Sequence, residues 1–295
     1  MVALVILAFL LCFSVNSGYA AILSTNDPRY TLWPVLFNTD PYVRVPVYVE
    51  KARYDLQTQL NINASLLALN TDLTGCLQFV QVPSPTNVGR DFIYVSPVSS
   101  TGAAQQTCGT VPGHLAGSNP GGQKMYILPG TGPGQCGGSV RQIMGRFANA
   151  IGLRNEYQRN DRPITVTTGN IATSLANIGA SMYAAYTANV TVYPQNTAYD
   201  YNSITQITPQ TNANPGVSMF TNPGGQASPT LNRLSNIDCN AIKWRYNCNS
   251  NVVCADPYGQ QTPANNNNNN IPPNNGQQTN PQQQPSGPVD PTDQF

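Results

Sequence analysis

The chain has 295 residues, a formal net charge of +1 and only 9% charged residues, against roughly 25% in an average soluble protein. No cluster of Lys or Arg builds the basic stripe that binding to nucleic acid or to an anionic membrane requires, so the composition excludes both partner classes. Asn, Gln, Thr, Ser, Gly and Pro take the place of the charged residues.

The first twenty residues are typical of a secretory signal. The segment from Val2 to Phe13 is apolar but too short to span a bilayer, and small residues precede a predicted cut before Ala21. No other apolar stretch approaches a membrane-spanning length, which predicts a secreted, extracellular protein without a membrane span. Glycosylation sequons at Asn63 and Asn189 agree with export.

Six cysteines remain once the signal, with Cys12, is removed. An even number in an exported chain predicts three disulfides in an oxidising compartment rather than thiolate metal sites. The spacing leaves their connectivity open. They are Cys76, Cys108, Cys136, Cys239, Cys248 and Cys254.

The first folded elements in chain order are a strand and a long helix. Residues 42–49 alternate like a strand, and Pro46 within them favours an edge strand or a bulge. Residues 76–80 and 91–95 are predicted as further strands. Between the first two strands, residues 55–73 are predicted as one amphipathic helix, because apolar residues recur there at helical spacing: Leu56, Leu60, Ala64, Leu67 and Ala68.

A second helix is predicted at residues 139–153 and ends at Gly152. Its apolar residues form a single stripe that we expect to be buried: Val140, Ile143, Met144, Phe147, Ala148 and Ile151. The predicted fold class is therefore α+β, with a mixed sheet, two main helices and a loop-rich C-terminal half.

The composition changes after Asp256. We expect a signal peptide at residues 1–20, one folded domain at 21–256 and an Asn/Gln/Pro-rich tail at 257–295. The tail has no apolar periodicity, so it is expected to be disordered and dispensable for folding. It is either a passive end or a segment for weak self-association, since Asn/Gln tracts favour intermolecular β contacts.

A motif with defined spacing runs through the second predicted helix. Residues 145–155 align without gaps on the metzincin signature H-E-x-x-H-x-x-G-x-x-H, and Glu156 follows it. Further motifs stand in order along the chain: Leu32-Trp33-Pro34, Cys76-Leu77-Gln78-Phe79-Val80, Gly121-Gly122-Gln123, Arg159-Asn160-Asp161-Arg162, Tyr199-Asp200-Tyr201-Asn202-Ser203-Ile204, Leu234-Ser235 and Tyr246-Asn247-Cys248. Together they resemble the astacin family of secreted zinc peptidases over nearly all of residues 30–248.

The resemblance implies a metzincin fold and a disulfide plan. Cys76 should pair with Cys248 and Cys108 with Cys136, which leaves Cys239 to pair with Cys254. It also implies where a zinc site would lie, because family enzymes hold zinc with three histidines and use the glutamate of the signature as general base.

The residues at those positions differ from the family pattern. Gly145, Asn149 and Asn155 stand at the three ligand positions, and Arg146 stands at the base position. Glycine has no side chain, an amide is a poor zinc ligand, and a guanidinium cannot accept a proton.

Two further positions differ from the family pattern. Thr205 stands where family enzymes have the methionine of the turn beneath the metal, and Ile207 stands where they have a tyrosine. We therefore expect no bound zinc, no other cofactor and no catalytic residues. The only histidine, His114, lies in a Gly/Pro-rich segment and is expected on a surface loop.

Three functional hypotheses follow. The first is a secreted, non-catalytic astacin-like pseudoprotease that serves as a structural or binding component of an extracellular matrix or secretion, with extracellular proteins or peptides as partners. The second is a decoy or regulator whose cleft captures peptides of active relatives. The third is a zinc metalloendopeptidase with an unforeseen metal set.

The resemblance also implies a place for the N-terminus after signal cleavage. The α-amino group of Ala21 is predicted to approach the Glu156 carboxylate directly or through one water. The alternative is a frayed terminus, with Glu156 bonded to backbone amides or to a nearby arginine.

Overall fold

The computed structural model describes residues 31–35, 42–86, 88–118, 121–186, 199–225, 229–249 and 251–258. The predicted signal peptide, Ala21, Asn189 and residues 259–295 of the predicted tail lie outside these ranges. The predictions that concern them therefore stay predictions.

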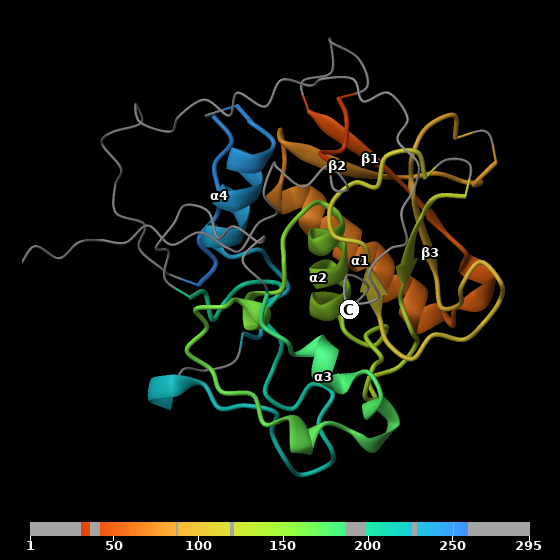
Figure 1. Ribbon diagram of the computed structural model, residues 1–295. Helices are drawn as coiled ribbons and strands as arrows, with labels where there is room; N and C mark the ends of the chain where they lie inside the picture. Colours follow the sequence, from red (N-terminus) through yellow and green to blue (C-terminus); the bar gives the residue numbers. More distant parts are fainter. Residues whose placement is uncertain are drawn as a thin grey trace, which may run out of the picture.

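A mixed five-stranded sheet forms one layer of the molecule, with β1, β2 and β3 in the upper right of Figure 1. The strand order is β2-β1-β3-β5-β4, and only β4 runs antiparallel to its neighbour β5. The strands are β1 (Val43–Val49), β2 (Leu77–Gln81), β3 (Ile93–Ser96), β4 (Gly109–Thr110) and β5 (Gln123–Tyr126). The predicted mixed sheet and α+β class are confirmed.

Pro46 lies in an interior strand, so its prediction as a mark of an edge strand was wrong. β1 pairs with β2 from Val43 onwards, whereas its pairing with β3 begins only at Val47. Val43 donates its backbone N–H to Cys76 of the β2 side, so the even-numbered residues of β1 point their nitrogens toward β3. The missing N–H of Pro46 therefore faces a stretch where β3 does not yet pair.

Helix α1 (Leu56–Asp72) forms where the sequence predicts it, but its buried face is a different one. Asp55 caps it by accepting a hydrogen bond from the Thr58 backbone N–H. Of the stripe used for the prediction, Leu56, Leu60 and Leu67 are 72%, 52% and 69% exposed. The core-facing side instead carries Asn61 and Ser65 together with apolar residues, which are Ile62, Leu66, Leu69, Leu73 and, at its border, Ala68.

Two buried polar groups on α1 explain this choice of face. Asn61 donates to the Gly137 carbonyl at 2.9 Å, and the Ser65 hydroxyl donates to the Val140 carbonyl at 3.0 Å. Both acceptors lie at the start of α2 (Val140–Ala150). Buried backbone carbonyls need hydrogen-bond donors, which leucine cannot supply, so α1 turns its Asn and Ser toward them.

Helix α2 runs through the centre of the molecule in Figure 1. Ser139 caps its first turn, and Gly152 has a φ of 108°, a backbone conformation that ends the helix and that other residues rarely adopt. The predicted apolar stripe packs into the core, with Phe147 edge-on against Phe79 of β2 at 5.3 Å between ring centroids. Arg141, Gly145 and Asn149 are buried as well, so α2 is enclosed on its polar side too.

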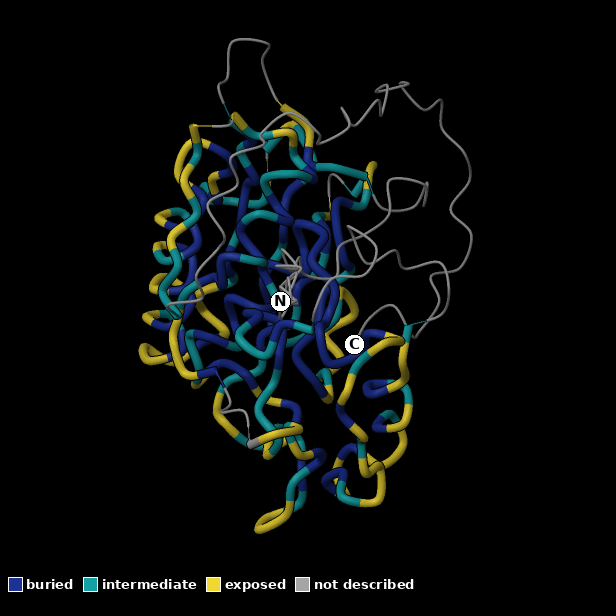
Figure 2. The backbone as a smooth tube through the Cα atoms, turned by 90° about the vertical axis from the view of Figure 1, so that its left-hand side faces the viewer, coloured by how far each residue is buried: buried dark blue, intermediate teal, exposed yellow. Residues whose placement is uncertain are grey.

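The described chain from the end of α2 to Gly225 is mostly loops, as predicted, and lies largely in the lower half of Figure 1. It contains the short helices η2 (Glu156–Gln158), η3 (Thr168–Asn170), η4 (Thr173–Leu175), α3 (Gly179–Met182) and η5 (Pro223–Gly225). This half has its own apolar cluster around Tyr157, Met182 and Phe220. In Figure 2 the buried parts of the tube lie inside and the exposed parts lie on outer loops.

Helix α4 (Asn236–Arg245) was not predicted from the sequence. Ser235 caps it by accepting a hydrogen bond from the Asp238 backbone N–H, so a cap signal was present. The helix covers the main core with Cys239, Ala241 and Ile242.

Three disulfides connect these parts. Cys76 is joined to Cys248, Cys108 to Cys136 and Cys239 to Cys254, the pairs that the resemblance implied. The first joins residues 172 positions apart, at the start of β2 and the end of α4. Among the helices of the described ranges, none combines the length and the apolar character needed to cross a membrane.

The ordered contacts of the chain extend beyond Asp256, the boundary placed from composition. The Tyr258 hydroxyl accepts a hydrogen bond from Arg141 at 3.1 Å and donates to the Leu231 carbonyl at 3.3 Å. We expect that deleting residues 259–295 changes the thermal midpoint by no more than about 2 °C. Deleting residues 258–295 should cost about 1 kcal/mol, because Arg141 is buried and loses an acceptor.

Thermal unfolding of the two truncated proteins, followed by circular dichroism, measures both effects. A large loss of stability in the shorter deletion would contradict the prediction that the tail is dispensable for folding.

Candidate functional site

One small cavity, of about 80 Å³, lies between the two halves of the chain and brings the predicted site positions together. Gly145, Arg146 and Asn149 line it from α2. Asn155, Thr205 and Ile207 line it from the loops that follow α2. The positions that the resemblance singled out therefore line one common cavity.

The two asparagines at ligand positions are bonded to each other. Asn149 donates through Nδ2 to Asn155 Oδ1 at 3.2 Å and to the Leu153 carbonyl at 2.8 Å. Asn155 donates in turn through Nδ2 to Gln158 Oε1 at 2.7 Å. The Tyr186 hydroxyl donates to the same Gln158 oxygen and accepts from the Asn155 backbone N–H at 2.6 Å. We call Asn149, Asn155, Gln158 and Tyr186 the amide network.

Arg146 lies on the open side of the amide network. Its Nη1 is 3.5 Å from Asn149 Oδ1, the oxygen of that amide. It also lies close to the Tyr157 hydroxyl, whose pKa is raised by burial, an effect that the positive charge of Arg146 partly offsets. The base position of the family frame therefore holds a cation in contact with a ligand position.

Gly145 packs directly against the turn below it. A Cβ added there would lie 3.0 Å from the Ile204 carbonyl oxygen, so any side chain requires the Ile204–Thr205 backbone to shift by a few tenths of an ångström. Thr205 is buried and ties this turn to the chain after α2, because its hydroxyl donates to the Arg154 carbonyl at 2.9 Å and accepts from the Glu156 N–H at 3.2 Å.

A buried carboxylate holds the turn from the other side. Asp238 of α4 accepts hydrogen bonds from the Ser203 hydroxyl at 2.8 Å and from the Ile204 N–H at 2.5 Å. Burial, together with the nearby Asp200 carboxylate, raises the pKa of Asp238 to about 7. Asp200 in turn accepts from the Ser235 hydroxyl at 2.6 Å. The turn under Gly145 is therefore clamped to α4 by two acidic residues.

Glu156 is fully buried beside an equally buried arginine. Its Oε1 accepts from Arg159 Nη1 at 2.7 Å and from the Asp200 backbone N–H at 2.8 Å. Arg159 also makes two bonds to Asp161, of 2.8 and 2.7 Å, and Asp161 is about half exposed. These contacts are the ones expected under the alternative prediction for Glu156, in which it bonds to backbone amides or to a nearby arginine. Its predicted contact with Ala21 stays a prediction, because Ala21 lies outside the described residues.

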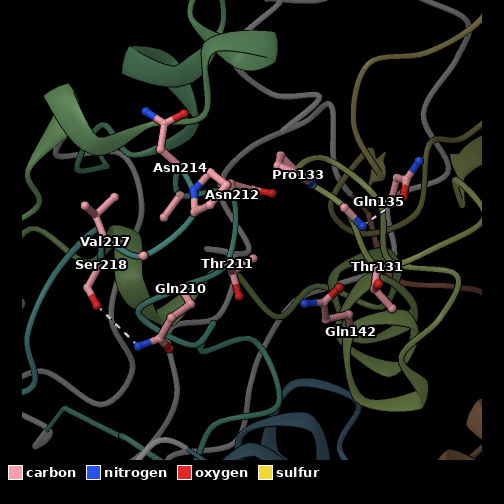
Figure 3. Close-up of a pocket in the computed structure, with 14 residues that line it drawn as sticks. Thr131, Pro133, Gln135, Gln142, Gln210, Thr211, Asn212, Asn214, Val217 and Ser218 are labelled. Carbon is pink, nitrogen blue, oxygen red and sulfur yellow. Dashed lines mark hydrogen bonds between the residues drawn. The ribbon is translucent and has the colours of Figure 1, made fainter.

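A larger groove adjoins the site and was not predicted. It has a volume of about 440 Å³ and shares Gln135, Gln142, Thr211 and Asn212 with the small cavity. Figure 3 shows its lining, in which no charged side chain of the described residues takes part. Amide and hydroxyl groups dominate: Thr131, Gln135, Gln142, Gln210, Thr211, Asn212, Asn214 and Ser218.

Some of these amides serve the fold, whereas others are available to a ligand. Asn212 accepts from the Gly134 N–H, and Gln210 donates to Ser218. The Gln142 side chain makes no hydrogen bond to the described part of the chain, and it lies where the groove and the small cavity meet. Sequence reasoning missed the groove because its amides come from α2 and from loops that are far apart in the chain.

His114 is buried, so its expected place on a surface loop was wrong. Its Nε2 lies 2.9 Å from Asp91 Oδ2, its Nδ1 lies 2.8 Å from the Thr31 hydroxyl, and its ring packs on Trp33 with centroids 4.6 Å apart. Burial lowers its pKa despite the Asp91 carboxylate. It stands apart from the residues that line the small cavity. Within the described ranges, no three His, Cys, Asp or Glu side chains converge as metal ligands.

Comparison with solved structures shows the fold of the chain. High choriolytic enzyme 1, a hatching enzyme zinc-protease from Oryzias latipes (Medaka fish), is similar with a TM-score of 0.56 and 20% identity, over 78% of this chain and 100% of that one. Myroilysin matches with a TM-score of 0.42 and 17% identity, over 80% of this chain and 95% of that one. No protein-family model matches, and no curated protein does. The chain therefore has an astacin-like fold.

Proposed function

We propose that this chain is an exported, non-catalytic protein with an astacin-like fold, which acts by binding rather than by hydrolysis. Its role is that of a structural or binding component of an extracellular matrix or secretion, and its partners are extracellular proteins or peptides. The signal-like residues 1–20, the sequons and the three disulfides support export.

The amide network carries this proposal. A zinc protease with the metzincin signature holds its metal with three neutral imidazole nitrogens aimed at one point, with a carboxylate beside them to take a proton from the bound water. Here two of the three ligand positions direct their amides at each other and at Gln158, and the third has no side chain. The side chains at these positions are bonded to the fold instead of being left for a metal.

The donor set does not fit zinc on electrostatic grounds either. Arg146 places its guanidinium against Asn149, and a cation at that distance repels a divalent metal. A carboxamide oxygen offers no negative charge to compensate. No step of a hydrolytic mechanism can therefore be assigned to these residues.

The groove gives the proposal its ligand chemistry. Its uncharged donors and acceptors match the backbone amides of an extended peptide, and its 440 Å³ fits a few residues. Two side chains are best placed to bind one. They are Gln142 and Gln135, whose oxygen accepts from the Gly132 N–H while its Nε2 group makes no hydrogen bond to the described residues.

The first test is a metal and peptidase assay on the purified, secreted protein incubated with zinc. We expect well below one zinc per chain and no cleavage of a protein substrate that an active protease of the same fold cleaves. The variant Gly145→His/Asn149→His/Asn155→His should also lack activity, because Arg146 still occupies the base position. It should be less stable than the wild type, because an imidazole side chain at position 145 would press on the Ile204 carbonyl.

Adding Arg146→Glu to that triple variant is the matched control. Removing the cation and supplying a carboxylate should raise zinc affinity by roughly tenfold or more over the triple variant. One zinc per wild-type chain, or peptidase activity in the triple variant that keeps Arg146, would overturn the proposal.

A further inference from the structure

The outer surface of α1 carries several exposed apolar side chains and no charge. Leu56, Leu60 and Leu67 project from it with most of their surface exposed, and Ala64 lies exposed between them. The only charged residue in α1 is Asp72, which is buried and bonded to Arg233. We call Leu56, Leu60, Ala64 and Leu67 the leucine face. Surface helices usually turn charged residues outward, so this row of apolar side chains is a candidate for association or for a cover.

Asn63 lies in the middle of the leucine face and is the acceptor of a glycosylation sequon. It is exposed, three residues after Leu60 and four before Leu67, which are the spacings at which helix side chains are neighbours. Its Oδ1 accepts a hydrogen bond from Gln81 at 2.7 Å. Its Nδ2, the atom that would carry a sugar, makes no hydrogen bond to the described residues, so a glycan would leave this contact intact.

We propose that an N-linked oligosaccharide on Asn63 covers the leucine face and keeps the protein from associating through it. The apolar sides of the sugar rings would lie on Leu60 and Leu67, and the hydroxyl groups would face water. The inference rests on the proposed export of the chain, since the modification needs the secretory pathway.

The structure also indicates that glycosylation precedes the packing of α1. Ser65, the third residue of the sequon, is fully buried, and its hydroxyl is bonded to the Asn61 and Val140 carbonyls. The enzyme that attaches the oligosaccharide must contact this hydroxyl, so the sugar is added before α1 packs on α2. The glycan is then present whenever the leucine face is exposed in the folded protein.

The experiment uses the full chain secreted from eukaryotic cells with the host's own signal, which separates this inference from the question of natural export. Peptide mass spectrometry should find Asn63 glycosylated. Asn63→Gln should bind several-fold more of an apolar fluorescent dye and self-associate on size-exclusion chromatography with light scattering. Adding Leu56→Gln, Leu60→Gln and Leu67→Gln to it should return both values to those of the wild type.

Asn189→Gln is the matched control, because it removes the other sequon and leaves the leucine face covered. If Asn63→Gln does not fold, an endoglycosidase that trims the folded wild type to one sugar gives the same comparison. An unmodified Asn63, unchanged dye binding after loss of the glycan, or association that persists without the three leucines would each overturn the proposal.

Discussion

Replacing Arg159 by leucine is expected to lower the free energy of unfolding by about 3–5 kcal/mol. Arg159 and Glu156 are both fully buried and 2.7 Å apart. Without the guanidinium, the buried Glu156 carboxyl loses its charge partner and depends on donors such as the Asp200 backbone N–H. Denaturant unfolding near neutral pH, with the disulfides intact, measures the loss.

Asp161→Asn is the control for this experiment, because Asp161 binds the same guanidinium but is about half exposed. It should cost no more than about 1 kcal/mol. The double variant Arg159→Leu/Glu156→Gln should recover part of the stability, since it removes both buried charges. A loss below about 1 kcal/mol in Arg159→Leu would contradict the prediction that this buried pair stabilises the fold.

The second large effect is a dependence of stability on pH that Asp238 produces. Its pKa rises from 3.8 to about 7 because of burial and the neighbouring Asp200 carboxylate, with Arg141 opposing. The folded state therefore holds a proton that the unfolded state releases between these two values. The stability from this group is complete below pH 3.8 and is lost as the pH rises through about 7.

Asp238→Asn should remove this loss. Its amide can keep both contacts of the protonated acid, accepting from the Ile204 N–H and donating to the Ser203 hydroxyl, which then donates to Thr205. Relative to the wild type, the variant should gain about 3 kcal/mol in free energy of unfolding between about pH 4.5 and about pH 7.5.

The measurement is the difference between variant and wild type at each pH. His114 has a lowered pKa and costs stability in acid, and this contribution cancels in the difference. Asp161→Asn serves as the control of opposite sign, because Arg159 lowers the pKa of Asp161 and its contribution is lost only below the usual range of a carboxyl group. A flat difference for Asp238→Asn would show that its carboxyl ionises normally.

The sequence by itself determined the elements that local signals specify. Helix α2 follows from an apolar stripe that ends at Gly152, all within one segment. The resemblance carried by the ordered motifs implied the disulfide pairs, which the structure contains. The residue types at Gly145, Arg146, Asn149 and Asn155 can be read without coordinates.

Only the tertiary structure decided which side of each element is inside. α1 carries leucines on both faces, and a helical period cannot choose between them. The face with Asn61 and Ser65 is buried because these side chains donate hydrogen bonds to the carbonyls of Gly137 and Val140. His114 was likewise enclosed by Trp33 and Asp91, which are distant in sequence.

The groove and the contacts that hold the turn beneath Gly145 also depend on segments that are distant in sequence. Asp238 and Ile204 are 34 residues apart, and the amides of the groove come from α2 and from loops on either side of it. The burial of a polar group depends on the partners that other segments bring to it. Those partners are selected by the free energy of the whole packed chain, to which a local pattern contributes only one part.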